Sequence, residues 1–168
     1  VAKYDAAPDA SASSTYDVVG IYFPKLTEVA NSIITYAGLG SVGGSRHWIN
    51  GITSSYGRTR VITHEFGHNY GLYHSNYWDP TQEVGGTYRD PNASSLEYGD
   101  IFDCMGSGNL PDAHFNHYQK KKINWLADDK IQEVTTPGTY KVYRFDHIDA
   151  DDNPLLALRI PMQSDVYY

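Results

Sequence analysis

The sequence predicts an α+β domain, and three features of its 168 residues support that fold class. A β-branched and aromatic segment over residues 17–23, stopped by Pro24, is typical of a strand. A helical pattern of apolar residues runs from Arg58 to a stop signal at Gly71. After Asp129 the pattern changes to alternating apolar and polar residues between turns, which indicates further strands.

The composition excludes several classes of protein. Hydrophobic residues make up 40% of the chain and aromatic residues 14%, which is enough to bury a core and excludes wholesale disorder. The 13 Lys and Arg against 20 Asp and Glu give a net charge of -7, the wrong sign for binding nucleic acid. No apolar run approaches the roughly 18 residues of a membrane span. The single cysteine, Cys104, excludes an internal disulfide.

The first fifteen residues are rich in Ala, Ser and Asp and are expected to form a polar lead-in with little packing power. The chain begins at Val1 without a methionine, so we expect either a processed mature form or an excised fragment. A propeptide or additional domains could therefore lie outside this chain.

The region between the first strand and the main helix has the least regular pattern. Residues 26–37 place apolar side chains at helical spacing, which predicts an amphipathic helix ended by Gly38 and Gly40. Residues 38–51 hold five glycines around Arg46, His47, Trp48 and Ile49. This composition predicts loops that flank a short strand at a sheet edge.

The second half of the chain predicts a loop, a helix and strands. Residues 75–103 are rich in Pro, Gly and polar residues and are expected to form a surface excursion. Asn116, with Gln119 three residues later, predicts the capped start of a second helix. Its mostly apolar side consists of Phe115, Tyr118, Ile123, Trp125 and Leu126, and its solvated flank of Lys120, Lys121 and Lys122. Strands are expected at residues 132–134, 139–145 and 155–160.

The main helix carries the segment HEFGHNYGLYH, which is the pattern HExxHxxGxxH over residues 64–74. On a helix, His64 and His68 differ by about 40° around the axis and about 6 Å along it, so both imidazoles can reach one ion. The helix can bury one face while it presents these ligands on the other, because their row lies roughly opposite the apolar row of Ile62, Phe66 and Tyr70.

The remaining positions of the motif complete a catalytic rather than a structural zinc site. Gly71 can adopt a positive φ, end the helix and let the chain swing His74 back toward the ion. Three imidazoles leave the fourth tetrahedral position for water. Zn²⁺ lowers the pKa of that water, and Glu65, adjacent to a ligand, is expected to be the general base and subsequent proton donor.

With a methionine in the segment DCMG at residues 103–106, this motif resembles the metzincin zinc endopeptidases, whose Met-turn lies beneath the metal. Met105 would then support the site without taking part in the chemistry. The segments EYGD at residues 97–100 and FNHYQKKKINWL at 115–126 are similar to the gametolysin (autolysin-like) peptidases. The resemblance spans about residues 17–126.

The resemblance implies a metzincin-like zincin domain with a twisted mixed sheet, an active-site helix ending at a glycine, a Met-turn, a later helix and a short β segment. We expect the edge strand that lines the cleft at residues 47–50, where an extended peptide could pair with it. The astacin and serralysin pattern has a tyrosine two residues after the turn methionine, and here Ser107 stands there, so no tyrosine ligand is assigned. The catalytic domain is expected over residues 1–128. Residues 129–168 form a β-strand segment packed on it or the start of a truncated C-terminal β region.

Other chemically active side chains have no assigned role in the site. Cys104 is expected to be a small buried hydrophobe. Asp100 and Asp103 could orient ligand imidazoles or cap turns, and both readings stay open. One of the 15 tyrosines could hydrogen-bond the oxyanion, but the sequence does not say which. Four histidines lack a ligand motif and are expected to be surface or hydrogen-bonded residues: His47, His114, His117 and His147. Calcium is not predicted, because no EF-hand loop surrounds the oxygen ligands Asp146, Asp149, Asp151, Asp152 and Asn153.

The sequence therefore predicts a secreted zinc endopeptidase with one catalytic ion held by His64, His68 and His74, a protein or peptide substrate, and Glu65 as the base. One alternative is a protein or carbohydrate binding module that retains a metal site. The other is a zinc hydrolase that acts on a non-peptide amide or only on free amino termini.

Overall fold

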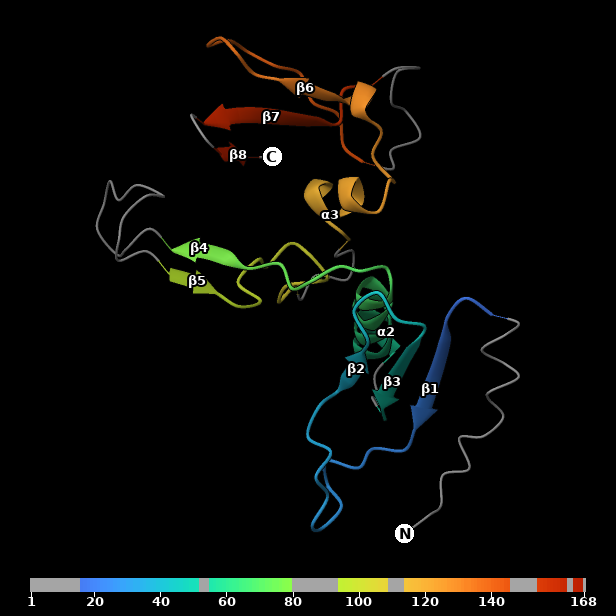
Figure 1. Cartoon of the computed structure of the whole chain (residues 1–168). Coiled ribbons are helices and arrows are strands. Elements are labelled where there is room, and N and C mark those ends of the chain that lie inside the picture. Colours follow the sequence, from blue (N-terminus) through green and yellow to red (C-terminus); the bar gives the residue numbers. More distant parts are fainter. Residues whose placement is uncertain are drawn as a thin grey trace. The chain divides into compact units, whose positions relative to one another are not determined.

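The computed structural model describes residues 16–51, 55–79, 94–108, 114–145, 154–162 and 165–167 (Figure 1). The chain divides into two compact units, residues 1–114 and 115–168. The described residues form a small mixed α+β structure, which confirms the α+β part of the predicted fold class, and the metzincin-like features stay a prediction. The domain boundary at residue 128 stays a prediction.

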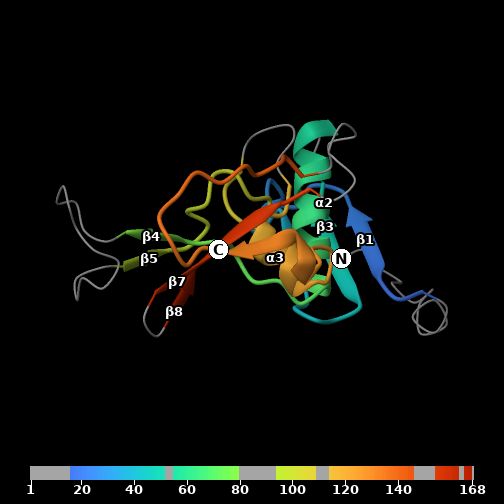
Figure 2. The same ribbon diagram turned by 90° about the horizontal axis from the view of Figure 1, so that it is seen from above.

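The first unit contains a three-stranded mixed sheet with the order β1-β3-β2. Strand β1 (Val19–Phe23) runs parallel to β3 (Arg46–Asn50), and β2 (Gly38–Gly40) runs antiparallel to β3. Helix α2 (Ser55–Asn69) packs against β2 and β3 (Figure 1), and Figure 2 shows the helix beside β3 from above. The strand predicted over residues 17–23 is thus confirmed, and it pairs with the strand predicted near residue 47.

The prediction that residues 47–50 form the edge strand is wrong. Strand β3 lies between β1 and β2, and His47, Ile49 and Asn50 are all buried. Among the described strands of this sheet, the edge beside the helix is β2. The Gly-Leu-Gly sequence of β2 has little intrinsic β propensity, so the pattern indicated only a loop there.

The prediction of a helix over residues 26–37 is also wrong. The segment contains two turns, in which Val29 N donates to Leu26 O (3.1 Å) and Ser32 N donates to Val29 O (3.0 Å). Asn31 has φ +64°, outside the helical region. The apolar side chains gain little burial, since Ile33 is 94% exposed. Helical spacing alone did not suffice, because β-branched residues lower helix propensity and the stripe is not buried against a partner surface.

Helix α2 was predicted from residue 58 to near Gly71, and the structure confirms it. Its most buried face is polar, however, and includes Glu65, His68 and Asn69, whereas Tyr70 is half exposed. The predicted packing of Tyr70 in the core is therefore wrong. Asn69 explains how polar groups fix this face: its amide donates to the carbonyl of Arg46 (2.9 Å) and its Oδ1 accepts from His47 Nδ1 (2.8 Å). These bonds satisfy buried donors and acceptors between the helix and the sheet.

The predicted surface excursion over residues 75–103 contains two short strands in its described residues. Strands β4 (Tyr77–Asp79) and β5 (Ser94–Leu96) pair antiparallel, and residues 80–93 lie outside the described chain. A turn follows at residues 104–107. Asp103 forms a bridge with His114, and Met105 is fully buried.

The second unit begins with the short helix α3 (His117–Lys122). Its predicted cap is confirmed, because Asn116 Oδ1 accepts from Gln119 N (2.9 Å). The prediction that Lys120 belongs to a solvated flank is wrong: the residue is 3% exposed, and its Nζ lies 4.1 Å from the centroid of the Phe145 ring. Conversely, Tyr118 and Trp125 of the predicted apolar side are half exposed.

Three strands follow the 3-10 turn η1 (Asp128–Lys130). Strand β6 (Ile131–Glu133) is parallel to β7 (Ala157–Met162), and β7 is antiparallel to β8 (Asp165–Tyr167). The strand predicted at residues 139–145 is absent from this described segment, although Tyr143 N donates to Leu155 O (2.8 Å). Among the described residues, no helix combines the length and the apolar content that crossing a bilayer requires.

Candidate metal centre

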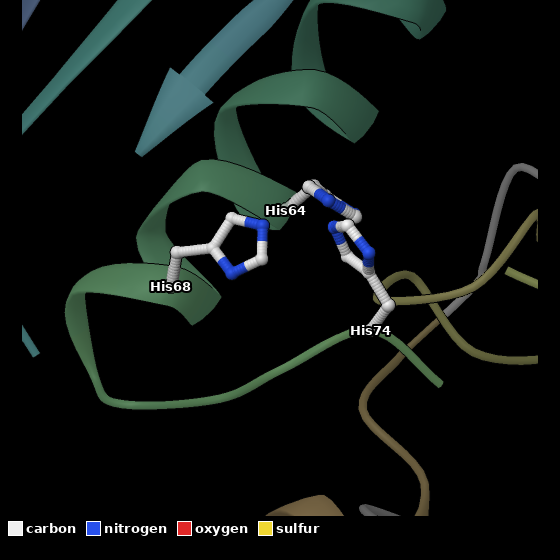
Figure 3. A group of neighbouring side chains, drawn as sticks. All are labelled: His64, His68 and His74. Atoms are coloured by element: carbon white, nitrogen blue, oxygen red, sulfur yellow. The ribbon is translucent and has the colours of Figure 1, made fainter. Parts of the chain in front are cut away.

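Helix α2 and the chain that leaves it bring three imidazoles together (Figure 3). The ring centroids of His64 and His68, one helical turn apart, are 4.8 Å from each other. The centroid of His74 lies 5.3 Å from that of His64 and 4.9 Å from that of His68. One ligand nitrogen from each residue lies within 4.8 Å of the others, so the group could hold a metal ion.

Gly71 produces the turn that returns the chain to the helix. It has φ +86°, and its N–H donates to the carbonyl of His68 (2.8 Å). A Cβ at this position would meet nothing within 4 Å, so the backbone conformation rather than a lack of space favours glycine. The next residue, Leu72, is fully buried and anchors the returning segment.

Each imidazole is oriented by a hydrogen bond at Nδ1. His64 Nδ1 donates to the Cys104 carbonyl (2.7 Å) and His68 Nδ1 to the Leu72 carbonyl (2.9 Å). His74 Nδ1 donates to Glu97 Oε1 (2.7 Å). Because carbonyl and carboxylate oxygens only accept, the proton of each neutral ring resides on Nδ1 and the lone pair of Nε2 stays available for a metal.

The donor set fits a zinc ion. Two nitrogens bound tetrahedrally to one zinc at about 2.0–2.1 Å lie about 3.3 Å apart. The upper limit of 4.8 Å between ligand atoms exceeds this by about 1.5 Å, which small rotations of two side chains cover. An all-imidazole set suits zinc and other late transition metals and does not suit calcium or magnesium.

Electrostatics keep two of these imidazoles neutral. Burial lowers the pKa of His64 to about 4, while the bond to the Cys104 carbonyl opposes the shift and the neighbouring His68, His74 and Arg60 add to it. Burial also lowers the pKa of His68, against the opposing effect of the Leu72 carbonyl. A neutral imidazole is the form that binds metal, so both shifts favour coordination near neutral pH.

Glu65 lies on the same helix, 5% exposed, with its carboxylate against strand β2. Burial raises the pKa of Glu65 to about 7, and the Gly40 N–H that donates to the carboxylate opposes this rise. A Cβ on Gly40 would come 2.7 Å from the Glu65 carbonyl oxygen, and one on Gly38 would overlap the carboxylate. The two glycines of β2 therefore allow the edge strand to approach this side chain closely.

The turn that contains Met105 supports the cluster through its backbone. Cys104, which precedes Met105, supplies the carbonyl that orients His64. Asp103 Oδ1 accepts from Met105 N (2.6 Å), and Asp100 Oδ1 accepts from Phe102 N (2.9 Å). Of the two readings left open for these aspartates, these bonds favour turn capping, since the Nδ1 partners of the imidazoles are other groups.

Two neighbours of the cluster were missed at the sequence level. Glu97 was noted only as part of a resembling segment, yet it orients His74. The ring centroid of Tyr98 lies 3.8 Å from that of His74 and 5.8 Å from that of His64. Burial raises the pKa of Tyr98, and the charges of Glu97 and Glu65 raise it further. Nothing in the sequence distinguishes Tyr98 from the other 14 tyrosines, apart from its place in that segment.

The other candidates stay outside the cluster. His47 is buried and bonded to Asn69, and His114 is exposed, as expected for histidines without a ligand role. Cys104 is buried, as predicted. The candidate calcium ligands and His147 lie outside the described residues.

A cavity of about 300 Å³ opens beside the imidazoles in the first unit. Helix α2 contributes Arg60, Val61, His64 and Glu65 to its wall, the approach to β2 contributes residues 36–38, and Tyr98 and Gly106 complete it. A small side chain or a short stretch of extended chain fits a space of this size next to the cluster.

A mixed α+β unit with three clustered imidazoles, a buried carboxyl on the same helix and an adjoining cavity has the features of a metal-dependent hydrolase. Comparison with known families agrees: a family model described as Peptidase M66 matches residues 10–136. The chain belongs to the Peptidase M66 family, whose members are metallopeptidases. This membership supports the resemblance to metzincin, gametolysin-type peptidases. No curated protein and no solved structure matches the chain.

Proposed function

We propose that the protein is a secreted zinc endopeptidase that hydrolyses peptide bonds of extracellular proteins. The observation that carries the proposal is the convergence of His64, His68 and His74, each with Nδ1 bonded and Nε2 available, beside the buried carboxyl of Glu65. The family supports peptide hydrolysis, and its members are typically extracellular.

His64, His68 and His74 would hold the ion. When bound, zinc supplies Lewis acidity, which polarises the substrate carbonyl and lowers the pKa of a coordinated water. Met105 would support the site as the buried residue of a Met-turn, since its neighbour Cys104 orients His64.

Glu65 would carry the proton transfer. Its carboxylate accepts a proton from the attacking water and then donates that proton to the leaving amine nitrogen. A general base is most effective when its pKa lies near the working pH, and the raised pKa of about 7 in the metal-free protein supports this role. The Gly40 N–H donates to this carboxylate and would help to orient it toward the water.

The substrate would bind as an extended chain along β2, the edge strand beside Glu65. Tyr98, whose ring lies against His74 and lines the cavity with Glu65, would donate its hydroxyl hydrogen to the oxyanion. Tyr98 is thus our candidate for the oxyanion-binding tyrosine, which the sequence alone does not identify.

The variant Glu65→Gln tests the proposal. It should keep stoichiometric zinc, because the three imidazoles are unchanged, and lose cleavage of a peptide blocked at both ends by at least about a hundredfold, as expected for a general base. Metal content by atomic absorption and cleavage by chromatography are the two measurements. The matched control is Glu28→Gln, an exposed carboxyl away from the cluster, which should retain activity.

Chelator treatment completes the test. It should abolish cleavage by the native protein, and added zinc should restore it. Cleavage that persists in the metal-free protein or in Glu65→Gln would contradict the assignment. Hydrolysis confined to free amino termini or to non-peptide amides would favour the alternative function of a zinc hydrolase that is not an endopeptidase. Stoichiometric zinc without any hydrolysis would favour a binding module.

A further inference from the structure

We propose that Arg60 makes the cavity beside the imidazoles a binding site for a carboxylate, so that the enzyme prefers substrates with Glu or Asp next to the cleaved bond. This inference rests on the proposed endopeptidase function and names its substrate class. Arg60 precedes His64 by one helical turn, and both line the cavity.

Within the described residues, the guanidinium of Arg60 has a single hydrogen bond, from Nη2. Its Nη2 donates to the Gly106 carbonyl over 3.3 Å, and its Nε is buried with no hydrogen-bond partner in the described part of the chain. A guanidinium has five N–H donors, and a buried donor left unpaired destabilises the folded protein. An acceptor that enters the cavity can bind the guanidinium, because Arg60 lines it.

The charges around the cavity favour an anion over a neutral acceptor. Arg60 is the permanent cation among the lining residues, and none of the ion pairs of the described chain involves it. Glu65 is the carboxyl of the lining, and it is bonded to the Gly40 N–H rather than to Arg60. A substrate carboxylate can therefore pair with a guanidinium for which the described residues supply no competing carboxylate, and such pairs are often bidentate.

The size and shape of the cavity suit a short acidic side chain. Its volume of about 300 Å³ accommodates the few heavy atoms of Asp or Glu. Val61 and Ala37 provide apolar wall for the methylene groups, and Gly38 and Gly106 line the same cavity. The same cavity contains His64 and Glu65, so a side chain bound there belongs to a residue that flanks the reacting carbonyl.

The experiment compares end-blocked peptides that differ only in the residues flanking the cleaved bond, which are Glu, Gln or Lys in turn. The native, zinc-loaded protein should cleave the Glu peptide with a kcat/KM at least about tenfold above that of the isosteric Gln peptide, with Lys poorest. In Arg60→Gln the difference between Glu and Gln peptides should disappear, and Arg60→Lys should keep part of it. Arg46→Gln, which changes an exposed arginine of β3, is the matched control and should keep the full preference.

Equal kcat/KM values for Glu and Gln peptides in the native protein would overturn the proposal, as would a preference that survives in Arg60→Gln. If Arg60→Gln does not fold, the kcat/KM values of the native protein for the Glu and Gln peptides still test the proposal. Failure of the native protein to cleave any of the peptides would instead count against the endopeptidase function, so the two failures are distinguishable. Zinc content of each variant, measured in parallel, separates a lost preference from a lost metal.

Discussion

Replacing Glu65 by glutamine should change how the stability of the metal-free protein depends on pH. Burial raises the pKa of Glu65 from 4.5 to about 7, so between these values the folded state holds a proton that the unfolded state has released. The contribution of this group to stability therefore falls as pH rises through that window. Glutamine has the same shape and no titration, so the variant lacks this loss.

The magnitude follows from the size of the shift. A difference of about 2.5 pKa units corresponds to about 3 kcal/mol at most. The carboxyl faces an open cavity, where solvent screens part of the penalty, so we expect about 1–2 kcal/mol. Metal-free Glu65→Gln should therefore gain this much stability relative to the native sequence on going from pH 5 to pH 8.

Urea unfolding of chelator-treated protein, followed by tryptophan fluorescence, measures the effect. Comparing the two proteins at each pH cancels the contributions of the histidines, which both contain. Glu28→Gln serves as the control and should show no such change. The reasoning that burial disfavours the ionised carboxyl would be refuted by one result. In that result, the stability difference between the native protein and Glu65→Gln is the same at pH 5 and pH 8, within about 0.3 kcal/mol.

Two further variants test the groups around the imidazoles. Glu97→Ala should weaken zinc binding about tenfold, because His74 loses the acceptor that orients its ring, and Glu97→Gln should recover most of this affinity. Competition with a chromophoric chelator measures the zinc affinity of both variants. An unchanged affinity in Glu97→Ala would contradict a role of the Glu97 carboxylate in zinc binding. Tyr98→Phe should lower kcat by about ten- to a hundredfold with zinc content and KM little changed, because the hydroxyl would act on the oxyanion alone. A kcat equal to that of the native protein would exclude this role.

The parts of the site that sequence reasoning predicted are those governed by local geometry. The spacing of His64 and His68 fixes their relative position once a helix forms, whatever the rest of the fold. Gly71 likewise acts within three residues of His74, through its own backbone conformation. Such short-range relations follow directly from the order of the residues.

The parts that were missed depend on contacts between distant segments. Glu97 reaches His74 across 23 positions, and Cys104 reaches His64 across 40. No periodicity marks such pairs, so the sequence indicated Asp100 and Asp103, either as acceptors for the imidazoles or as turn caps, and did not indicate Glu97. The prediction of the edge strand was wrong for a related reason. Strand β2 forms because β3 and Glu65 lie beside it, and its Gly-Leu-Gly sequence has no preference of its own for a strand.

The helix predicted over residues 26–37 is wrong for the opposite reason, because that prediction depended on a local pattern alone. Its helical spacing is real, but a helix of that length is stabilised mainly by burying its apolar face. Ile33, the most exposed of its apolar residues, has no such contact. Tertiary burial, rather than spacing, decided the conformation there.

The acceptors of the three imidazoles differ in a way that matters for how the protein can vary. Two of them, at Cys104 and Leu72, are main-chain oxygens that every amino acid carries, so no substitution at those positions deletes the acceptor itself. The third belongs to an exposed side chain, Glu97, which a single base change can replace. A substitution of Glu97 is therefore the simplest way for natural drift or laboratory selection to change the affinity for the ion. This residue lies at the rim of the site, outside the helix.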